Sequence, residues 1–180
     1  SHDGGAKTLV IEKSTQFGGT SATSGGGVWI PNNRYAKAEN VDDSDQDARD
    51  YINSVSPEGK IKDELVETYL SEGPKMIDYL HDNSQVKYRN LAHYPDYFPD
   101  NPGGKAGNRS MEPEPIKGTE LGDDLGKLRE QHPQTAFTMG PINMNFTQVE
   151  GQLLLGALPG WKSQFAKLFT KYILDIPMRF

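Results

Sequence analysis

The segment from Lys7 to Asn33 constrains this chain most, because it joins a short apolar run to a high density of glycine. The run Thr8–Ile11 ends at the acidic residue Glu12, and glycines follow at positions 18–19 and 25–27. A short continuous apolar run bounded by turn residues is typical of a strand buried on both faces of a parallel sheet. The segment therefore predicts a buried strand over residues 8–11, followed by a loop.

An acidic residue at the end of such a strand is characteristic of dinucleotide-binding units. Its carboxylate accepts hydrogen bonds from ribose hydroxyls and stands about 20 residues after a glycine-rich phosphate turn. Counting back that far from Glu12 leads upstream of Ser1. We therefore expect the chain to be a fragment of a cofactor enzyme, with the first strand and the phosphate loop absent from it.

The loop after Glu12 carries groups that suit a bound dinucleotide. Glycine lets the backbone pass close to a flat ring or a pyrophosphate, and the hydroxyls nearby can donate hydrogen bonds to phosphate or to ring heteroatoms. The alternative is that the strand, the acid and the glycines form only a turn. The candidate cofactor-binding residues are Glu12, Lys13, Gly19, Thr20, Ser21, Ser24, Gly25 and Gly26.

Composition narrows the class of protein. The chain has 180 residues, 34% of them hydrophobic, with 19 glycines, 12 prolines, no cysteine and a net charge of −6. The low hydrophobic content and the many turn residues favour part of a larger fold. The charge argues against a nucleic-acid partner, and the lack of cysteine excludes disulfides and thiolate chemistry. We assign no metal site and expect a cytoplasmic protein, with membrane association as an open alternative.

Apolar spacing and capping residues predict four helical segments. They cover residues 42–54, with Ser44 as the cap; 62–83, with Pro74 as a break or a new first turn; 121–130; and 161–176. We expect an ordered loop or lid over residues 94–115, where proline and glycine are frequent, and irregular structure over residues 131–144.

The C-terminal helix is expected to be amphipathic. Seven apolar residues, four of them aromatic, share one face of the segment 161–176, while Lys162, Lys167 and Lys171 lie on other faces. This face either packs against other parts of the enzyme or lies at a membrane surface, where it would form an entrance for an apolar substrate.

A second candidate site is the segment from His93 to Pro99, HYPDYFP. A buried tyrosine hydroxyl can relay a proton or orient a carbonyl, and the flanking prolines stiffen the loop that would position it. On the residues alone, an aromatic cluster that packs on the surface is the more common outcome, and His93 is more often a solvated loop histidine than a base.

A family resemblance rests on these same motifs. The sequence EKSTQFGGTSATSGGGVWIPNN resembles the flavin-binding loop of the 3-ketosteroid dehydrogenases, within the fumarate reductase/succinate dehydrogenase group of flavoproteins. The Pro-Asp-Tyr-aromatic segment and the stretch 107–113 are also similar to that family. The resemblance implies an α/β fold: a fragment of a Rossmann-like FAD-binding domain of the GR2 type, with inserted helices, long ordered loops and non-covalent FAD.

The resemblance also implies an organisation for the chain, which would be a partial FAD-binding domain throughout. Residues 1–33 would supply the second strand and flavin loop, 34–92 a helical segment, 93–145 an active-site loop region and 146–180 the amphipathic helical segment. The substrate domain would be absent from it.

Site roles follow from the same likeness. Tyr97 would be catalytic, assisting a second tyrosine that abstracts a substrate proton, while Tyr94 and Gly27 would contact the substrate and Arg109 would pair with a carboxylate. The implied reaction is 1,2-dehydrogenation of steroid ring A, by proton abstraction and hydride transfer to the flavin. Its partners would be a 3-ketosteroid and an external electron acceptor.

Two alternatives remain open. Other reductases of the same group need an arginine, and often a histidine, to hold a carboxylate substrate, whereas Tyr94 and Tyr97 suit a large neutral one. A non-enzymatic interaction module with an exposed aromatic helix is the other. We also expect the 180-residue chain by itself to be inactive and to show no flavin absorbance after purification; a stoichiometric yellow cofactor would contradict that expectation.

Overall fold

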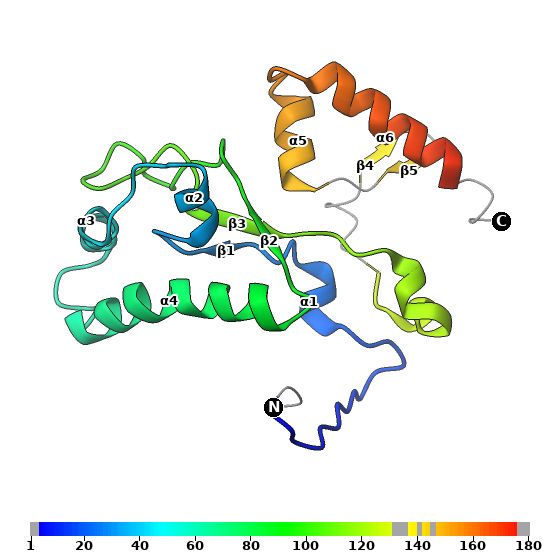
Figure 1. Ribbon diagram of the computed structural model, residues 1–180, viewed down its shortest axis with the longest axis horizontal. Coiled ribbons are helices and arrows are strands. Elements are labelled where there is room, and N and C mark those ends of the chain that lie inside the picture. The colour runs from blue at the N-terminus through cyan, green and yellow to red at the C-terminus, as the bar shows by residue number, and fades with distance from the viewer. Residues whose placement is uncertain (1–3, 131–136, 140–141, 145–146, 176–180) are drawn as a thin grey trace. The chain divides into compact units, whose positions relative to one another are not determined.

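The computed structural model describes residues 4–130, 137–139, 142–144 and 147–175 (Figure 1). The chain divides into two compact units. The first comprises residues 1–11 and 26–114, and the second comprises residues 12–25 and 115–180. One boundary between them therefore falls inside the glycine-rich loop, between Gly25 and Gly26.

The first unit contains a small antiparallel sheet with the strand order β1-β3-β2. The strands are β1 (Val28–Trp29), β2 (Tyr88–Asn90) and β3 (Ser110–Pro113). Met111 of the central strand lies opposite Val28 on one side and Asn90 on the other, and it is fully buried. The sheet thus joins the end of the glycine loop to two segments that lie 60 or more residues later in the chain.

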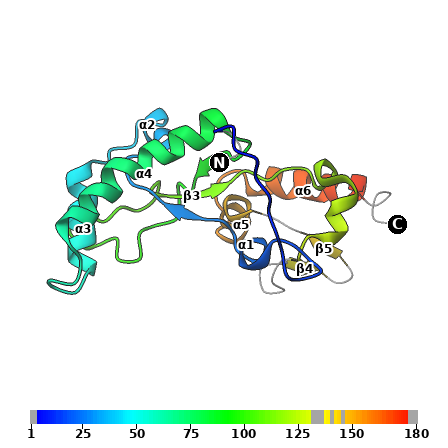
Figure 2. The same ribbon diagram turned by 90° about the horizontal axis from the view of Figure 1, so that it is seen from below.

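Three helices accompany the sheet: α2 (Arg34–Ala38), α3 (Asp45–Val55) and α4 (Asp63–Asn83). Figures 1 and 2 show α4 as the long helix of this unit, beside the shorter α2 and α3. One buried cluster joins α4 to the sheet region through Ile30, Ile77 and Met111, and another joins α3 to α4 through Ala48, Val66 and Leu70. The core of the first unit therefore consists of two clusters along α4, one shared with the sheet region and one shared with α3.

The helix expected over residues 42–54 is confirmed as α3, with its first helical residue at Asp45. The Ser44 hydroxyl accepts a hydrogen bond from the Asp47 amide at 3.1 Å, which satisfies one of the amide groups that a helix start leaves unpaired. Asp45 and Asp47 occupy the first turn, where negative charge is favourable. Tyr51 lies on the buried face of this helix.

Residues 62–83 could hold one or two helices, and the alternative with a break at Pro74 is wrong, because α4 runs without interruption from Asp63 to Asn83. A proline inside a helix removes one backbone hydrogen bond and costs about 3 kcal/mol. Buried residues lie on both sides of it, Val66 and Leu70 before and Ile77 after. Their burial in two apolar clusters outweighs the local cost and keeps the helix continuous.

The predicted strand at residues 8–11 is also wrong for this structure. The segment has no regular structure, and Leu9, Val10 and Ile11 are each more than 80% exposed. A parallel strand needs neighbours for its backbone groups and for both of its faces. Within the described residues no strand pairs with this segment, so its apolar side chains stay in solvent.

The second unit contains α1 (Gly19–Thr23), the 3₁₀ segment η1 (Gly118–Lys127), β4 (Phe137–Met139), β5 (Ile142–Met144), α5 (Gln148–Leu155) and α6 (Trp161–Asp175). The helix expected over residues 121–130 is thus a 3₁₀ segment that starts three residues earlier and kinks at Gly122, where φ is +52°. The prediction of irregular structure over 131–144 is wrong for β4 and β5, which pair with each other in antiparallel orientation. Residues 131–136 and 140–141 of that prediction lie outside the described residues.

The C-terminal amphipathic helix is confirmed as α6. Leu168 is buried. Four other residues of the same apolar face are between 37% and 48% exposed: Trp161, Phe165, Phe169 and Ile173. The preceding helix α5 begins with a capping box, in which Thr147 and Glu150 each bond the other's backbone amide. In the part of the chain that the structure describes, no helix is long and apolar enough to span a bilayer.

Candidate functional site

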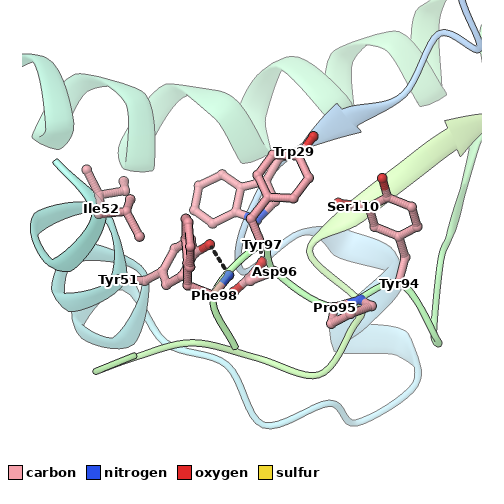
Figure 3. A pocket seen from close by; sticks show the side chains of 10 residues that line it. Trp29, Tyr51, Ile52, Tyr94, Pro95, Asp96, Tyr97, Phe98 and Ser110 are labelled. Atoms are coloured by element: carbon pink, nitrogen blue, oxygen red, sulfur yellow. Dashed lines mark hydrogen bonds between the residues drawn. The ribbon is translucent and has the colours of Figure 1, made fainter. Parts of the chain in front are cut away.

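The first unit holds an apolar pocket of about 320 Å³, which is near the lower end of the range for small-molecule sites. Figure 3 shows the side chains that line it. They come from β1, from α3, from residues 94–98 and from the start of β3. The lining residues are Trp29, Tyr51, Ile52, Val55, Tyr94, Pro95, Asp96, Tyr97, Phe98 and Ser110.

We call residues 94–105 the tyrosine loop; it is closed by its own backbone. The Asp96 amide donates to the Lys105 carbonyl at 3.0 Å, and a turn inside the loop joins Gly104 to Asn101 at 2.9 Å. Gly103 has a φ of +70°, and a Cβ there would lie 1.9 Å from the Asp47 carbonyl oxygen. Only glycine therefore allows the loop to approach α3 this closely.

Asp96 is the buried anchor of the tyrosine loop. One carboxylate oxygen, Oδ1, accepts a hydrogen bond from the Trp29 indole at 2.6 Å. The other, Oδ2, accepts from the Arg109 guanidinium at 2.9 Å and from the Lys105 amide at 3.0 Å. All three partners are donors, so both carboxylate oxygens of Asp96 act as hydrogen-bond acceptors.

Arg109 links this anchor to the start of α3. Its guanidinium contacts both oxygens of Asp43, with the shortest distance at 2.7 Å, and the side chains of Arg109, Asp43 and Asp96 are each at least 96% buried. The guanidinium carbon also lies 5.6 Å from the Trp29 ring centre and 5.7 Å from that of Tyr51. The prediction that Arg109 pairs with a carboxylate is confirmed, with two partners rather than one.

Trp29 stands at the centre of an aromatic cluster. Its ring centre is 5.9 Å from that of Tyr51 and 6.3 Å from that of Tyr69, which stacks on it. The Tyr69 hydroxyl donates to the Trp29 carbonyl, and partial burial raises the pKa of Tyr69 above its usual value. On the other side, the Phe98 amide donates to the Tyr51 hydroxyl at 3.3 Å. The aromatic cluster therefore fixes one wall of the pocket to α3 and α4.

The structure brings the two predicted tyrosines to the same pocket. Tyr94 is half-buried, whereas Tyr97 is 84% exposed and lies at the rim. Gly27 is exposed and is not among the residues that line the pocket, and His93 is exposed as expected of a loop histidine. The pocket thus contains Tyr94 and Tyr97 and leaves Gly27 outside.

The candidate cofactor residues are divided between the units. Those from Glu12 to Gly25 belong to the second unit, and Gly26 and Gly27 belong to the first. The Glu12 carboxylate is exposed, and within the described residues it accepts a local hydrogen bond from the Ser14 amide at 2.9 Å. Gly26 has a φ of +68°, and a Cβ there would lie 2.8 Å from Pro113.

Several residues of this site escaped prediction from sequence. Trp29 and Tyr51 line the pocket, and Asp43 is one of the buried charges paired with Arg109. A tryptophan two residues after a glycine run and an aspartate between Pro95 and Tyr97 are signals that could have marked Trp29 and Asp96. Asp43 gives no such signal, because an acidic residue before a helix is common for reasons of helix electrostatics alone.

Comparison with known proteins decides the family. Residues 1–158 match the family described as "FAD binding domain". The chain belongs to the FAD-binding domain family. FAD is therefore the cofactor of the domain to which these residues belong, as the sequence predicted, and the coarse fold class is that of an FAD-binding domain built from helices and small sheets.

Several relatives of this chain are named as 3-oxosteroid 1-dehydrogenases. A 3-oxosteroid 1-dehydrogenase of Mycolicibacterium smegmatis is 36% identical over 145 residues, which cover 81% of this chain and 25% of the relative. Another, from Comamonas testosteroni, is 34% identical over 97% of this chain and 30% of its own length. The chain therefore spans about a quarter to a third of these proteins.

A solved structure agrees with these relatives. The crystal structure of 3-ketosteroid delta1-dehydrogenase from Sterolibacterium denitrificans, in complex with 1,4-androstadiene-3,17-dione, is 38% identical with a TM-score of 0.84 and covers 99% of this chain and 31% of that one. A different activity is also represented: a 4-oxocyclohexanecarboxylate 2-dehydrogenase of Sinomonas cyclohexanicum is 34% identical over 75% of this chain and 23% of its own length.

The residues present fit FAD at the flavin loop. Gly19 has a φ of +49°, and a Cβ there would meet no atom within 4 Å, so the space beside it is open to a ligand. Thr20 and Ser21 are exposed in the same turn, and Glu12 offers an exposed carboxylate. Hydroxyl donors and a ribose-binding acid are the groups that a dinucleotide requires.

Proposed function

We propose that this chain is part of an FAD-dependent 3-ketosteroid dehydrogenase that introduces a 1,2 double bond into steroid ring A. The observation that carries the proposal is the apolar pocket between the tyrosine loop and α3, with Tyr94 and Tyr97 in its lining. It occurs in a chain that is 38% identical, over 99% of its length, to a delta1-dehydrogenase bound to a steroid dienone.

In this proposal the tyrosine loop supplies the groups that meet the substrate. Tyr97 stands at the rim, where its hydroxyl can hold or pass a proton at the reacting ring, and it assists a second tyrosine outside this chain. Tyr94 packs against the steroid rings, while Gly27, which does not line this pocket, remains a proposed substrate contact on the residue pattern alone. The aromatic lining excludes water from an apolar substrate.

The charges of the pocket favour a neutral substrate. Among the residues that line it, none is a lysine or an arginine, and the nearby Arg109 is buried and engaged by Asp43 and Asp96. A carboxylate substrate, such as those named for the Sinomonas relatives, requires a cation to offset its charge. This argues for a steroid ketone over a cyclohexanecarboxylate or a fumarate-like acid.

For the cofactor, we propose non-covalent binding in a Rossmann-like domain of the GR2 type. Glu12 would accept the ribose hydroxyls, and Thr20, Ser21 and Ser24 would donate to phosphate or to ring heteroatoms. Lys13 adds positive charge, and Gly19, Gly25 and Gly26 allow close approach of the backbone. When bound, FAD accepts the hydride that leaves the substrate, and an external acceptor takes the electrons onward.

The test is an assay of the full-length enzyme with two substrates. We expect the 1,2-dihydro form of 1,4-androstadiene-3,17-dione to be desaturated in the presence of an artificial electron acceptor, with 4-oxocyclohexanecarboxylate a poor substrate. Efficient turnover of the carboxylate alone would favour the second candidate, a cyclohexanecarboxylate dehydrogenase, and would reject the steroid proposal.

Peripheral membrane contact of a cytoplasmic enzyme is a separate proposal, supported by α6. Trp161 and Phe165 of its apolar face are partly exposed, and three lysines lie along the helix. Co-sedimentation of the full-length enzyme with liposomes, compared with a Trp161→Asp/Phe165→Asp variant, tests it. Equal sedimentation of the two would reject membrane contact through this helix.

A further inference from the structure

The buried acid Asp96 ties the tyrosine loop to Trp29 and Arg109 beside the pocket. Pro95 and Tyr97 flank Asp96 in the chain. The directions of the Pro95 and Tyr97 side chains therefore depend on where the Asp96 backbone is held. Asp96 is 5% exposed, and its carboxylate and amide together make four hydrogen bonds, to Trp29, Arg109 and the amide and carbonyl of Lys105.

The far end of this network is also fixed. Arg109 is held by Asp43, and Asp43 in turn accepts a hydrogen bond from the Asn32 amide at 3.0 Å. The Arg109 carbonyl accepts from the Ile30 amide at 2.8 Å, which ties the arginine backbone to the end of β1. The buried charges thus connect the tyrosine loop to β1 and to the start of α3, which together form the pocket wall.

We propose that Asp96 is a positioning residue, whose carboxylate, clamped by Arg109, Trp29 and Lys105, sets where Tyr94 and Tyr97 stand around the pocket. This rests on the proposed function for the identity of the ligand. Asp96 acts on the substrate through the tyrosines. Both of its carboxylate oxygens already accept hydrogen bonds from donors within the protein.

The hydrogen-bond pattern makes this proposal specific to the carboxylate. In an Asp96→Asn variant of equal size, the amide nitrogen would have to face a donor, either the Trp29 indole or the pair formed by Arg109 and the Lys105 amide. The loop then has to shift to relieve the conflict. A displacement of about 1 Å at a reacting group can cost about 100-fold in rate.

The experiment compares two Asp→Asn changes in the full-length flavoenzyme. Asp96→Asn disturbs the buried anchor, and Asp47→Asn is the matched control, because Asp47 pairs with the Lys105 side chain of the same loop at 3.0 Å on the exposed side. The readouts are kcat and KM per bound flavin, the Kd of 1,4-androstadiene-3,17-dione by equilibrium dialysis, and hydrogen exchange of residues 94–105.

We expect Asp96→Asn to lower kcat/KM by about 10- to 100-fold, to weaken product binding and to speed exchange in the loop. Asp47→Asn should leave all three close to wild type. A merely structural role would change the yield of folded enzyme and leave kcat, KM and Kd per bound flavin unchanged, and that result would overturn the proposal.

A second variant keeps the proposal testable if Asp96→Asn fails to fold. Trp29→Phe removes one donor and leaves the charged partner, so we expect a milder weakening of product binding, about 2- to 10-fold. In the Asp96→Asn/Trp29→Phe double variant, the asparagine nitrogen would face the space that the indole leaves. The fold loss of product binding in the double variant should therefore be smaller than the product of the two single-variant losses. Unchanged product binding in Trp29→Phe would contradict the clamp.

The proposed function and the positioning role of Asp96 can be rejected separately. Wild-type enzyme that does not desaturate steroids would reject the proposed function, and the hydrogen-exchange comparison would still decide whether Asp96 holds the loop. Active wild type with Asp96→Asn indistinguishable from Asp47→Asn would reject the positioning role alone.

Discussion

The tyrosine loop and the segment Ala6–Glu12 differ in whether their side chains find partners among the described residues. The loop contributes the buried Asp96 to a network with Arg109 and Asp43 outside the loop, and each of these charges has partners within the first unit. The segment carries an apolar run that sequence alone predicts to be buried, and yet Leu9, Val10 and Ile11 are exposed. The pocket wall is therefore specified by contacts inside the chain, whereas burial of the strand depends on neighbours that the described residues do not provide.

The largest expected effect lies at the centre of the tyrosine-loop network. Arg109→Met should leave Asp43 and Asp96 buried without a cation and destabilise the enzyme by about 3–5 kcal/mol. Chemical denaturation followed by tryptophan fluorescence measures this loss. A variant as stable as wild type would show that the buried charges contribute little, and the contrast between the two regions would then disappear.

A pair of glycines gives the next largest effect. Gly103→Ala should cost about 2–5 kcal/mol, because its φ is +70° and the new Cβ would meet the Asp47 carbonyl. Gly59→Ala is the matched control: φ is +67° and nothing lies within 4 Å, so only the conformational cost of about 1–2 kcal/mol applies. Equal shifts in the midpoint of thermal unfolding would show that the close packing of the loop on α3 is unimportant.

The partly exposed ion pair between Lys105 of the same loop and Asp47 should matter less. The hydrogen bond from Lys105, then that from Ser44, lowers the pKa of Asp47 below its usual 3.8. A lowered folded-state pKa means that the stabilisation is present above pH 3.8 and is lost as the pH falls through the lower value. For an exposed pair it amounts to under about 1 kcal/mol. The test is acid unfolding of wild type and Asp47→Asn; the variant should lose less stability than wild type below pH 3.8, and identical acid dependence would contradict the pairing.

The smallest stability effect is expected in the N-terminal segment. Val10 is 87% exposed, so Val10→Asp should change the stability of the 180-residue chain by less than about 0.5 kcal/mol. In the full-length enzyme the same change should abolish flavin retention, because there the segment would form a strand of the cofactor domain. Flavin content by absorbance decides this, and full retention would reject the role of the strand.

Local signals predicted part of this structure well. Ser44 marks the start of α3, apolar spacing marks α4 and α6, and a conspicuous arginine after the loop is indeed paired with carboxylates. The predictions that were wrong concern segments whose structure depends on residues far away in the sequence. Pro74 stays in its helix because Ile30 and Met111 bury the turns around it, and the apolar run at 8–11 finds no sheet. The link between Asp43 and Asp96 crosses 53 residues of chain, which no local pattern encodes.

The central claim is that a pocket built around Tyr94 and Tyr97 serves desaturation of a neutral steroid ketone. The most direct measurement is mass spectrometry of the product formed by the full-length enzyme from a 3-ketosteroid labelled with deuterium at carbons 1 and 2. We predict that one label is lost from each of these carbons and that Tyr97→Phe slows the reaction. Retention of both labels, with hydrogen lost from carbons 4 and 5 or with no turnover at all, would contradict the account.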